Sequence, residues 1–181
     1  PEGPEEVLPF LDSVLRGRTV PPARKAEVAR RYGLFGGVSP INAQTRALQE
    51  AVRLDWEERG IDLPVYWGSR HSTPSIVDAL RDMSRDGVRN ALALVTSAYS
   101  SFSSCRQYLD AIQESRATIG PAAPEVVKLR AYFNHPDFVQ AWVERGRDAM
   151  HSLPVAARSH VQVLFTAHSI PVTMAEKCAY V

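Results

Sequence analysis

The most informative stretch of this chain is Val161-Gln162-Val163-Leu164-Phe165-Thr166-Ala167-His168-Ser169-Ile170-Pro171. Its apolar first half, residues 161–165, predicts a buried strand of a parallel sheet. His168 therefore follows the end of a strand, where open α/β sheets place their ligands. Pro171 lacks a backbone donor and disfavours helix at Ile170, which places the histidine on a turn. A neutral imidazole there can accept a proton, bind a metal, or simply hydrogen-bond a neighbouring loop.

Helical and strand-like segments alternate along the rest of the chain. Apolar spacing, with Pro and Gly near the segment ends, predicts helices over residues 5–15, 23–32, 43–59, 75–85, 104–119 and 137–151. Apolar runs predict strands over residues 63–67, 91–96, 126–132 and 161–166. This order predicts an α/β fold with a doubly wound parallel sheet and right-handed crossovers. In the last long helix we expect Phe138, Trp142 and Val143 to face inward.

Three of the predicted strands are followed at once by polar or aromatic loop residues. The carboxyl ends of parallel strands share one edge of a sheet. We therefore expect His71, Tyr99 and His168, one from each loop, to converge on a single cleft.

The bulk composition narrows the class of protein. A chain of 181 residues fits one domain with a sizeable core. Its 21 basic and 20 acidic side chains nearly cancel, so no overall field indicates a nucleic-acid or acidic-membrane partner. No apolar run is long enough for a transmembrane segment, and no signal peptide opens the sequence. Cys105 and Cys178 form no disulfide framework, which favours a cytoplasmic location.

Four more motifs accompany the His168 stretch. They are Pro1-Glu2-Gly3-Pro4-Glu5-Glu6-Val7, Gly36-Gly37-Val38-Ser39-Pro40-Ile41, Tyr66-Trp67-Gly68-Ser69-Arg70-His71-Ser72-Thr73-Pro74 and Ser97-Ala98-Tyr99-Ser100-Ser101-Phe102-Ser103. In this order the motifs make the chain closely resemble the ferrochelatases, enzymes that insert ferrous iron into a porphyrin. The resemblance runs from residue 1 to about residue 180, and its motifs are specific in combination and weak singly.

The resemblance implies that residues 1–181 are the N-terminal half-domain of a ferrochelatase. In that family a strand precedes the position of Pro1, and a second half-domain follows that of Val181. The opening Pro-Glu-Gly-Pro loop, in place of a hydrophobic strand, fits this interpretation. The implied substrates are a porphyrin and Fe²⁺, and an acidic metal-site partner would come from the second half-domain. We expect residues 1–181 alone to be inactive, marginally stable and prone to aggregate.

The two histidines of the motifs are the first candidate site residues. Metallation removes two pyrrole protons, which suits a base poised near neutral pH in an apolar slot. The resemblance implies that His168 is this proton acceptor, a ligand of Fe²⁺, or both. It also places His71 near the cleft as a substrate-binding residue, because related ferrochelatases carry a histidine at the matching position. The alternative for His71 is a surface histidine near a helix start.

Other residues are candidates for porphyrin binding. The resemblance places Arg16 and Arg18 near the propionate groups, and the planar guanidinium binds carboxylates bidentately; the alternative is solvated charge at a helix end. Ser39 can donate to a porphyrin carboxylate, or it can cap the following helix. Ile41 can pack on the ring.

Aromatic residues frame the serine-rich loop over residues 97–104. Tyr99 and Tyr108 can hydrogen-bond a ligand edge, and Phe102 offers an apolar face. Ala98 departs from the family pattern, because many ferrochelatases have histidine or glutamine there.

Some bacterial ferrochelatases carry a [2Fe–2S] cluster with one ligand in this half. Cys178 is the candidate for that ligand, and the alternative is a plain thiol.

Three other interpretations stay open to different degrees. A cobalt or nickel chelatase of tetrapyrrole synthesis shares the fold, but the motifs favour iron. A non-catalytic metal- or tetrapyrrole-binding module would carry its complete ligand set within the chain. A dinucleotide-binding protein is disfavoured, because no Gly-x-Gly-x-x-Gly follows a strand. The sequence does not separate coproporphyrin from protoporphyrin as substrate, and it leaves the oligomeric state unknown.

Overall fold

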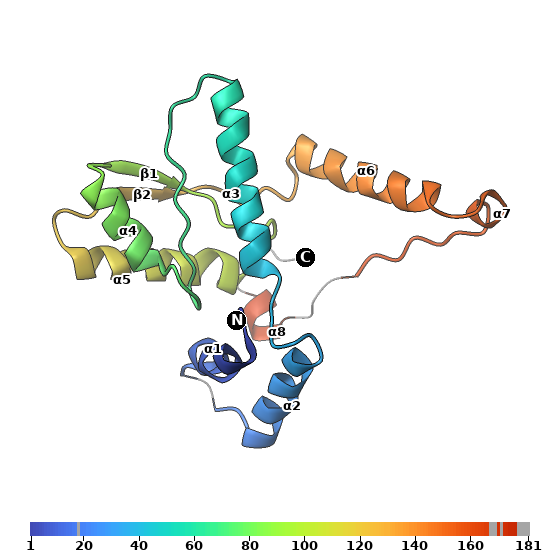
Figure 1. The fold of residues 1–181 in the computed structure, drawn as a ribbon, viewed down its shortest axis with the longest axis horizontal. Coiled ribbons are helices and arrows are strands. Elements are labelled where there is room, and N and C mark those ends of the chain that lie inside the picture. The colour runs from blue at the N-terminus through green and yellow to red at the C-terminus, as the bar shows by residue number, and fades with distance from the viewer. Residues whose placement is uncertain (18, 167–169, 171, 177–181) are drawn as a thin grey trace. The chain divides into compact units, whose positions relative to one another are not determined.

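The computed structural model describes residues 1–17, 19–166, 170 and 172–176 (Figure 1). These residues form a helix-rich α/β chain that divides into two units. Unit 1 comprises Pro1–Arg89 and Ala111–Glu125, and unit 2 comprises Asn90–Asp110 and Val126–Val181. No helix in the described part of the chain combines the length and the apolar character that crossing a membrane requires.

Four helices from the first 85 residues belong to unit 1. A short 3-10 turn, η1 (Pro4–Glu6), leads directly into α1 (Val7–Leu15). The next helices are α2 (Pro22–Gly33), α3 (Ile41–Glu58) and α4 (Ile76–Arg85). All four were predicted from the sequence to within a few residues, because local signals fix their ends.

The end of α3 and the start of α4, on either side of the loop of residues 59–75, illustrate these local signals. After α3, the N–H of Ile61 donates to the carbonyl of Trp56 (2.8 Å), and Gly60 takes a left-handed φ of 69° that costs glycine little. Before α4, Ser75 and Asp78 form a capping box in which each side chain accepts from the other's backbone N–H.

The small core of unit 1 lies under these helices. Val7 and Leu11 are the buried residues of α1, and Ala79 and Leu80 those of α4. The helix α1 also contacts α2. Val7 and Leu11 are four residues apart, so they lie on one face of α1.

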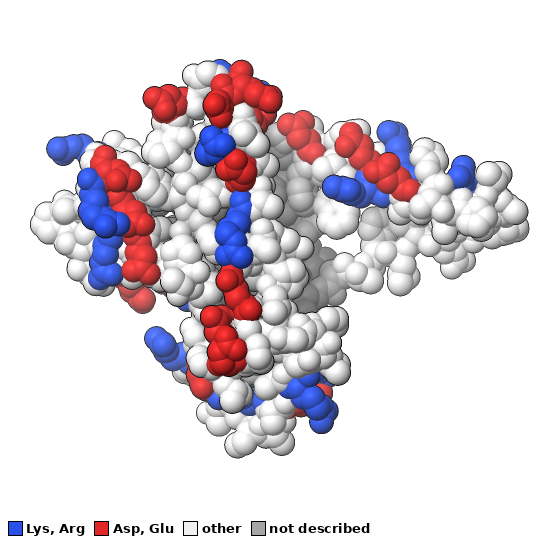
Figure 2. Space-filling model, in the orientation of Figure 1, with Lys and Arg blue, Asp and Glu red and all other residues white. Residues whose placement is uncertain are grey.

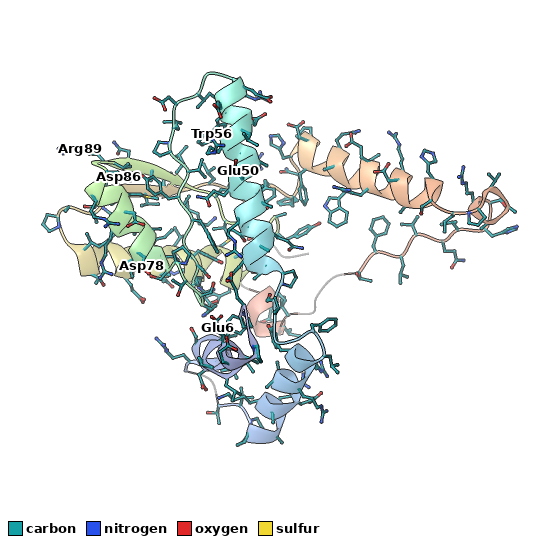
Figure 3. All side chains as sticks on the ribbon, viewed as in Figure 1. Glu6, Glu50, Trp56, Asp78, Asp86 and Arg89 are labelled. Atoms are coloured by element: carbon teal, nitrogen blue, oxygen red, sulfur yellow. The ribbon has the colours of Figure 1, made fainter. Side chains whose placement is uncertain are left out.

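The strand predicted over residues 63–67 does not form, so that prediction was wrong. Gln49 donates to the carbonyl of Val65 (2.7 Å), and the Tyr66 hydroxyl donates to Asp86 (2.7 Å), a residue labelled in Figure 3. Only one isolated parallel bridge, Ser69 to Ser75, follows. A strand forms through backbone hydrogen bonds to a neighbouring strand. In the described chain, these two hydrogen bonds of the segment instead involve the side chains of Gln49, Tyr66 and Asp86.

A two-stranded parallel sheet is formed by β1 (Asn90–Ala93) and β2 (Glu125–Lys128). The N–H groups of Glu125 and Leu129 donate to the carbonyls of Arg89 and Ala93 (2.8 and 2.9 Å), so both strands advance in the same direction. The connection between them contains a π-helical turn, η2 (Phe102–Arg106), and α5 (Gln107–Ile119). The predicted strands over residues 91–96 and 126–132 are confirmed as shorter elements.

The remaining helices are α6 (Pro136–His151), α7 (Val155–Arg158) and α8 (Val172–Ala175). Phe138 packs edge-to-face with Tyr132 and Trp142, with ring centroids 5.2 and 6.3 Å away. Trp142 is nevertheless 64% exposed, and Val143 is exposed too, so the inward orientation predicted for these two was wrong. Within unit 2 no described element covers that face of α6.

The strand predicted over residues 161–166 is also absent, although most of its residues are apolar. Phe165 is 92% exposed, and Leu164 is nearly as open. Apolar residues alone do not make a strand when no described segment pairs with them. The described residues therefore hold a two-stranded parallel sheet.

Candidate functional site

A cavity of about 270 Å³ lies in unit 1 beside His71. The N-terminal segment, α1, the first turn of α3 and the loop before α4 form its walls. Glu6 marks the start of α1 in Figure 3. The lining residues are Pro1, Glu2, Glu6, Pro9, Phe10, Asn42, His71, Ser72 and Thr73.

His71 is held in a tight loop at the wall of this cavity. Its Nδ1 lies 3.1 Å from the hydroxyl of Ser13 in α1. The backbone N–H groups of His71 and Ser72 both donate to the hydroxyl of Ser69 (3.3 and 3.2 Å). The Ser72 hydroxyl donates to the same oxygen (2.8 Å). His71 is half-buried, and its backbone position is fixed by this serine-centred turn.

A polar network links the His71 loop to the N-terminal segment. Asn42, only 6% exposed, donates to Glu2 (3.1 Å), and its Oδ1 lies 3.4 Å from the Ser72 hydroxyl, whose one proton is closer to Ser69. Arg46 donates to the same Glu2 oxygen (2.7 Å) and lies over the ring of Trp67, 5.9 Å from its centroid. Hydrogen bonds from Arg46 and Asn42, together with the Arg46 charge, hold the pKa of Glu2 below its ordinary value. Glu2 is therefore ionised at neutral pH.

Acidic and basic side chains alternate along the exposed side of α3, as Figure 2 shows. Arg53 pairs with Glu50 (2.8 Å) and with Glu57 (3.2 Å), and Arg46 pairs with Glu2. Each of these pairs is about half exposed or more, so it contributes little to stability. Because every arginine of the column has a carboxylate partner, the column is not an anion site.

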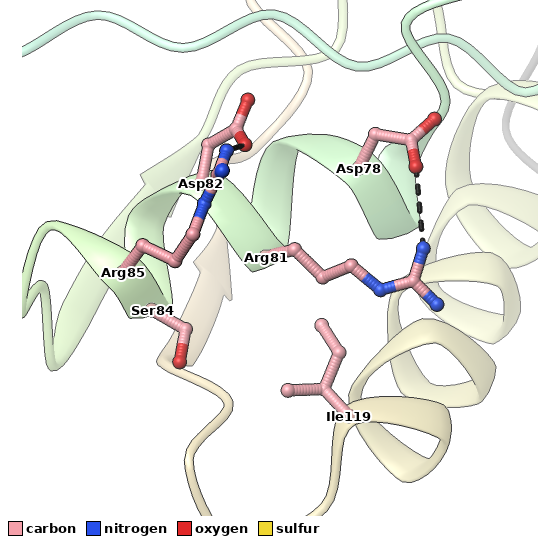
Figure 4. A pocket seen from close by; sticks show the side chains of 6 residues that line it. All are labelled: Asp78, Arg81, Asp82, Ser84, Arg85 and Ile119. Carbon is pink, nitrogen blue, oxygen red and sulfur yellow. Dashed lines mark hydrogen bonds and ion pairs between the residues drawn. The ribbon is translucent and has the colours of Figure 1, made fainter.

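A larger hollow of about 470 Å³ lies on unit 1 beside α4 (Figure 4). Arg81 and Arg85 each pair with the aspartate one turn earlier, Asp78 and Asp82. Figure 4 shows the two pairs, with Ile119 below the side chain of Arg81. Its charges are satisfied within one helix, so we assign no chemistry to it.

Three further sequence-predicted residues lie in unit 1. The Ser39 N–H donates to the carbonyl of Pro1 (2.8 Å), and its hydroxyl accepts from Ile41 at 3.5 Å, a weak contact for a helix cap. Ile41 is 60% exposed at the start of α3. Arg16 is exposed at the end of α1, and Arg18 lies outside the described residues.

The aromatic candidates lie in unit 2. Tyr99 is 50% exposed and stacks on Phe133, with ring centroids 6.4 Å apart. Phe102 is exposed, and Tyr108 is half-buried in α5. Ala98 is buried, and its carbonyl accepts from the N–H of Phe133 (3.1 Å), so position 98 is a packing position in unit 2.

The hydroxyls of Ser101 and Ser104 are buried and bonded within the serine-rich loop. Each accepts from the other's backbone N–H (3.0 and 2.9 Å), and the Ser104 hydroxyl donates to the carbonyl of Tyr99 (2.7 Å). This capping box starts η2 and α5. These two hydroxyls therefore shape the loop that carries Tyr99.

Cys105 is a half-buried thiol in the same loop region. Burial raises its pKa, but hydrogen bonds from Ser100, the Ser101 backbone and Ser104, with the charge of Lys128, lower it below its ordinary value overall. In the described part of the chain, no group of histidine, cysteine or acidic residues could hold a metal. Cys178 and His168 lie outside the described residues.

The predicted convergence of three residues on one cleft stays a prediction. His71 belongs to unit 1 and Tyr99 to unit 2, and His168 is not described. The residues that sequence reasoning missed are Ser13 and Asn42. Asn42 had a usable signal, because it directly follows the Gly-Gly-Val-Ser-Pro-Ile motif, whereas Ser13 had none.

Comparison with known proteins defines the class. The family model described as Ferrochelatase matches residues 1–181. The chain therefore belongs to the ferrochelatase family. The chain is 50% identical to the coproporphyrin III ferrochelatase of Nocardia farcinica over 172 residues, which cover 95% of this chain and 49% of that protein.

Two other relatives are similar to the same extent. The coproporphyrin III ferrochelatase of Streptomyces coelicolor is 48% identical, with 97% of this chain and 48% of that protein covered. The ferrochelatase of Rhodopirellula baltica is 47% identical, with 99% of this chain and 51% of that protein covered. The chain spans about half the length of the curated relatives it matches.

Proposed function

We propose that the whole protein inserts Fe²⁺ into a porphyrin, giving a haem and two protons, in haem biosynthesis. The observation that carries this proposal is the ferrochelatase family match across residues 1–181. The half-buried His71 beside a cavity in unit 1 supports it.

The proton-transfer role is proposed for His168. It accepts a pyrrole proton, donates to Fe²⁺, or does both in sequence, with an acidic partner from a second half-domain. A histidine suits this work because its unperturbed pKa lies near neutral pH. The support is its place in the Ala-His-Ser-Ile-Pro motif.

Substrate binding is proposed for residues of both units. Basic side chains bind the porphyrin carboxylates, hydroxyl and imidazole groups donate to them, and apolar or aromatic groups pack on the ring. The exposure of Arg16, Ile41, Tyr99 and Phe102 supports these roles, because a ligand can reach them. The proposed set is Arg16, Arg18, Ser39, Ile41, His71, Tyr99, Phe102 and Tyr108.

Coproporphyrin III is the proposed porphyrin. Three relatives at 48 to 50% identity carry the name coproporphyrin III ferrochelatase. The whole protein should therefore metallate coproporphyrin III faster than protoporphyrin IX. Equal or reversed rates would leave iron insertion standing and remove this choice of substrate.

We also propose that residues 1–181 act as an N-terminal half-domain and that a doubly wound parallel sheet assembles in the whole protein. Support comes from the exposed apolar side chains of Leu92 on β1 and Val127 on β2, which suit a sheet covered on both faces. A crystal structure of the whole protein tests the sheet directly.

The described residues do not fit an iron–sulfur group. Cys105 is engaged with neighbouring serines, and no metal-binding cluster is found in the described ranges. No step of the proposed function involves a cluster. Cys178 as a cluster ligand stays a proposal, and iron and sulfide analysis of the whole protein, with Cys178→Ser as the comparison, tests it.

A cytoplasmic location is proposed as well. Its support is the pair of cysteines without a disulfide framework. Fractionation of cells that express the whole protein, followed by immunodetection, tests it.

The decisive experiment for the function is anaerobic incubation of the whole protein with Fe²⁺ and coproporphyrin III. Loss of porphyrin fluorescence with gain of haem absorbance is the expected result. Residues 1–181 alone should produce neither signal. Insertion by residues 1–181 alone would overturn the half-domain proposal, and no insertion by the whole protein with either porphyrin would overturn the function.

A further inference from the structure

The His71 ring makes a polar contact with Ser13 of α1. The hydroxyl oxygen of Ser13 and Nδ1 of His71 lie 3.1 Å apart, across 58 residues of sequence. Both residues are half-buried. A neutral imidazole has one nitrogen that donates and one that accepts, so the direction of this hydrogen bond decides the tautomer.

Other helical hydroxyls of the chain show where the Ser13 proton would otherwise go. Thr45, Ser115 and Thr118 each donate to the carbonyl four residues earlier (2.7, 2.7 and 2.9 Å). Ser13 also lies within a helix, α1, but the described residues contain no such bond from its hydroxyl. Its hydrogen-bond partner there is Nδ1 of His71, which is therefore the acceptor within reach of its proton.

We propose that Ser13 is a positioning residue that holds His71 in the tautomer protonated on Nε2. This inference rests on the proposed function, because it concerns how the porphyrin-binding residue His71 recognises its ligand. When Nδ1 accepts the hydrogen bond from Ser13, the proton of the neutral ring is on Nε2, and Nε2 can donate a hydrogen bond to the ligand. A carboxylate oxygen of a porphyrin is the class of acceptor that such a donor suits.

The surroundings of the ring agree with a donor. The serine-centred turn at Ser69 fixes the backbone of His71, and the contact with Ser13 helps to orient the ring. The two carboxylates that line the same cavity already accept hydrogen bonds. Glu2 accepts from Asn42 and Arg46, and Glu6 accepts from the N–H of Glu2 (2.9 Å).

The tautomer is tested directly by NMR of the whole protein with ¹⁵N-labelled histidine, without porphyrin. The resonances of His71 are assigned by their loss in His71→Gln. In the unaltered protein, at a pH where the ring is neutral, Nδ1 should give the shift of an unprotonated, hydrogen-bonded nitrogen and Nε2 that of a protonated one. Ser13→Ala should shift Nδ1 and mix the tautomers, whereas Ser13→Thr should keep the unaltered pattern. Ser115→Ala, which removes a half-buried helical hydroxyl elsewhere, should leave it unchanged.

Kinetics with coproporphyrin III and Fe²⁺ add a second readout. Ser13→Ala should raise KM by about threefold to tenfold, the effect of one lost hydrogen bond, with little change in kcat. In the His71→Gln background, Ser13→Ala should have no further effect on KM, because the two residues act together.

A proton on Nδ1 in the unaltered protein, or ring shifts that stay the same in Ser13→Ala, would overturn the proposal. An additive effect in the double variant would also overturn it. The NMR shifts of the ring are measured without catalysis. If the whole protein inserts no iron, the proposed function is wrong, but the NMR experiment still shows which tautomer His71 adopts.

Discussion

Asn42 at the start of α3 donates to Glu2 across 40 residues of sequence, at 3.1 Å. Its other amide atom, Oδ1, lies 3.4 Å from the hydroxyl of Ser72 beside His71. One buried amide thus joins the N-terminal segment, α3 and the His71 loop. The shape of the cavity in unit 1 depends on that junction.

Asn42→Ala should destabilise the whole protein by about 1–3 kcal/mol, because it leaves partners of a buried amide without their hydrogen bonds. Urea unfolding followed by circular dichroism measures this free energy of unfolding. Gln44→Ala is the matched control, since Gln44 is an exposed amide on the same helix. Equal effects of the two substitutions would show that the Asn42 network does not stabilise the fold.

The ion pair of Glu2 should make a small part of the stability depend on pH. Hydrogen bonds from Arg46 and Asn42 lower the pKa of Glu2 in the folded state. Its contribution is therefore present above the ordinary glutamate pKa and is lost as the pH falls through the lowered value.

The melting temperatures of the unaltered protein and Glu2→Gln test this dependence. The unaltered protein should melt slightly higher at about pH 7, and the difference should shrink as the pH falls through the lowered pKa of Glu2. Glu27, Glu50 and Asp78 also have lowered pKa values, so only the difference between the proteins is informative. A difference that stays constant with pH would argue against an ionic origin.

His168→Ala should abolish iron insertion by the whole protein while the fold stays intact. The reason is the loss of the proposed proton acceptor and metal donor from the most specific motif. Loss of porphyrin fluorescence measures turnover, and circular dichroism checks the fold. His160→Ala, at an exposed histidine in the same region, is the control. Near-normal turnover in His168→Ala would sink the assignment.

Replacing Arg16 and Arg18 together by alanine should raise KM for coproporphyrin III by about tenfold or more, because charge-assisted hydrogen bonds to the propionates are lost. The effect on kcat should be smaller, since these contacts exist in the ground state and the transition state alike. Arg145 and Arg147, exposed in α6, provide the paired control substitution. A collapse of kcat at unchanged KM would assign these arginines a different role.

The helices were predictable because their signals are local. Gly60 ends α3 and Ser75 begins α4 through bonds that span only a few residues. The sheet was harder to predict. Residues 63–67 and 161–166 have the apolar character of strands, yet neither pairs with a strand among the residues that the structure describes. Pairing depends on a distant segment, and no property of the run itself supplies it.

The candidate site divides in the same way. From its own motifs the sequence determined the ferrochelatase class and named His71, and its assignments of His168, Arg18 and Cys178 stay predictions. Only the tertiary structure decided that Ser13 meets the His71 ring and that Asn42 holds Glu2 and Ser72 together. These contacts span 58, 40 and 30 residues. They exist because α1, α3 and the loop before α4 pack around one cavity, and hydrogen bonds of this kind leave no periodic pattern in a sequence.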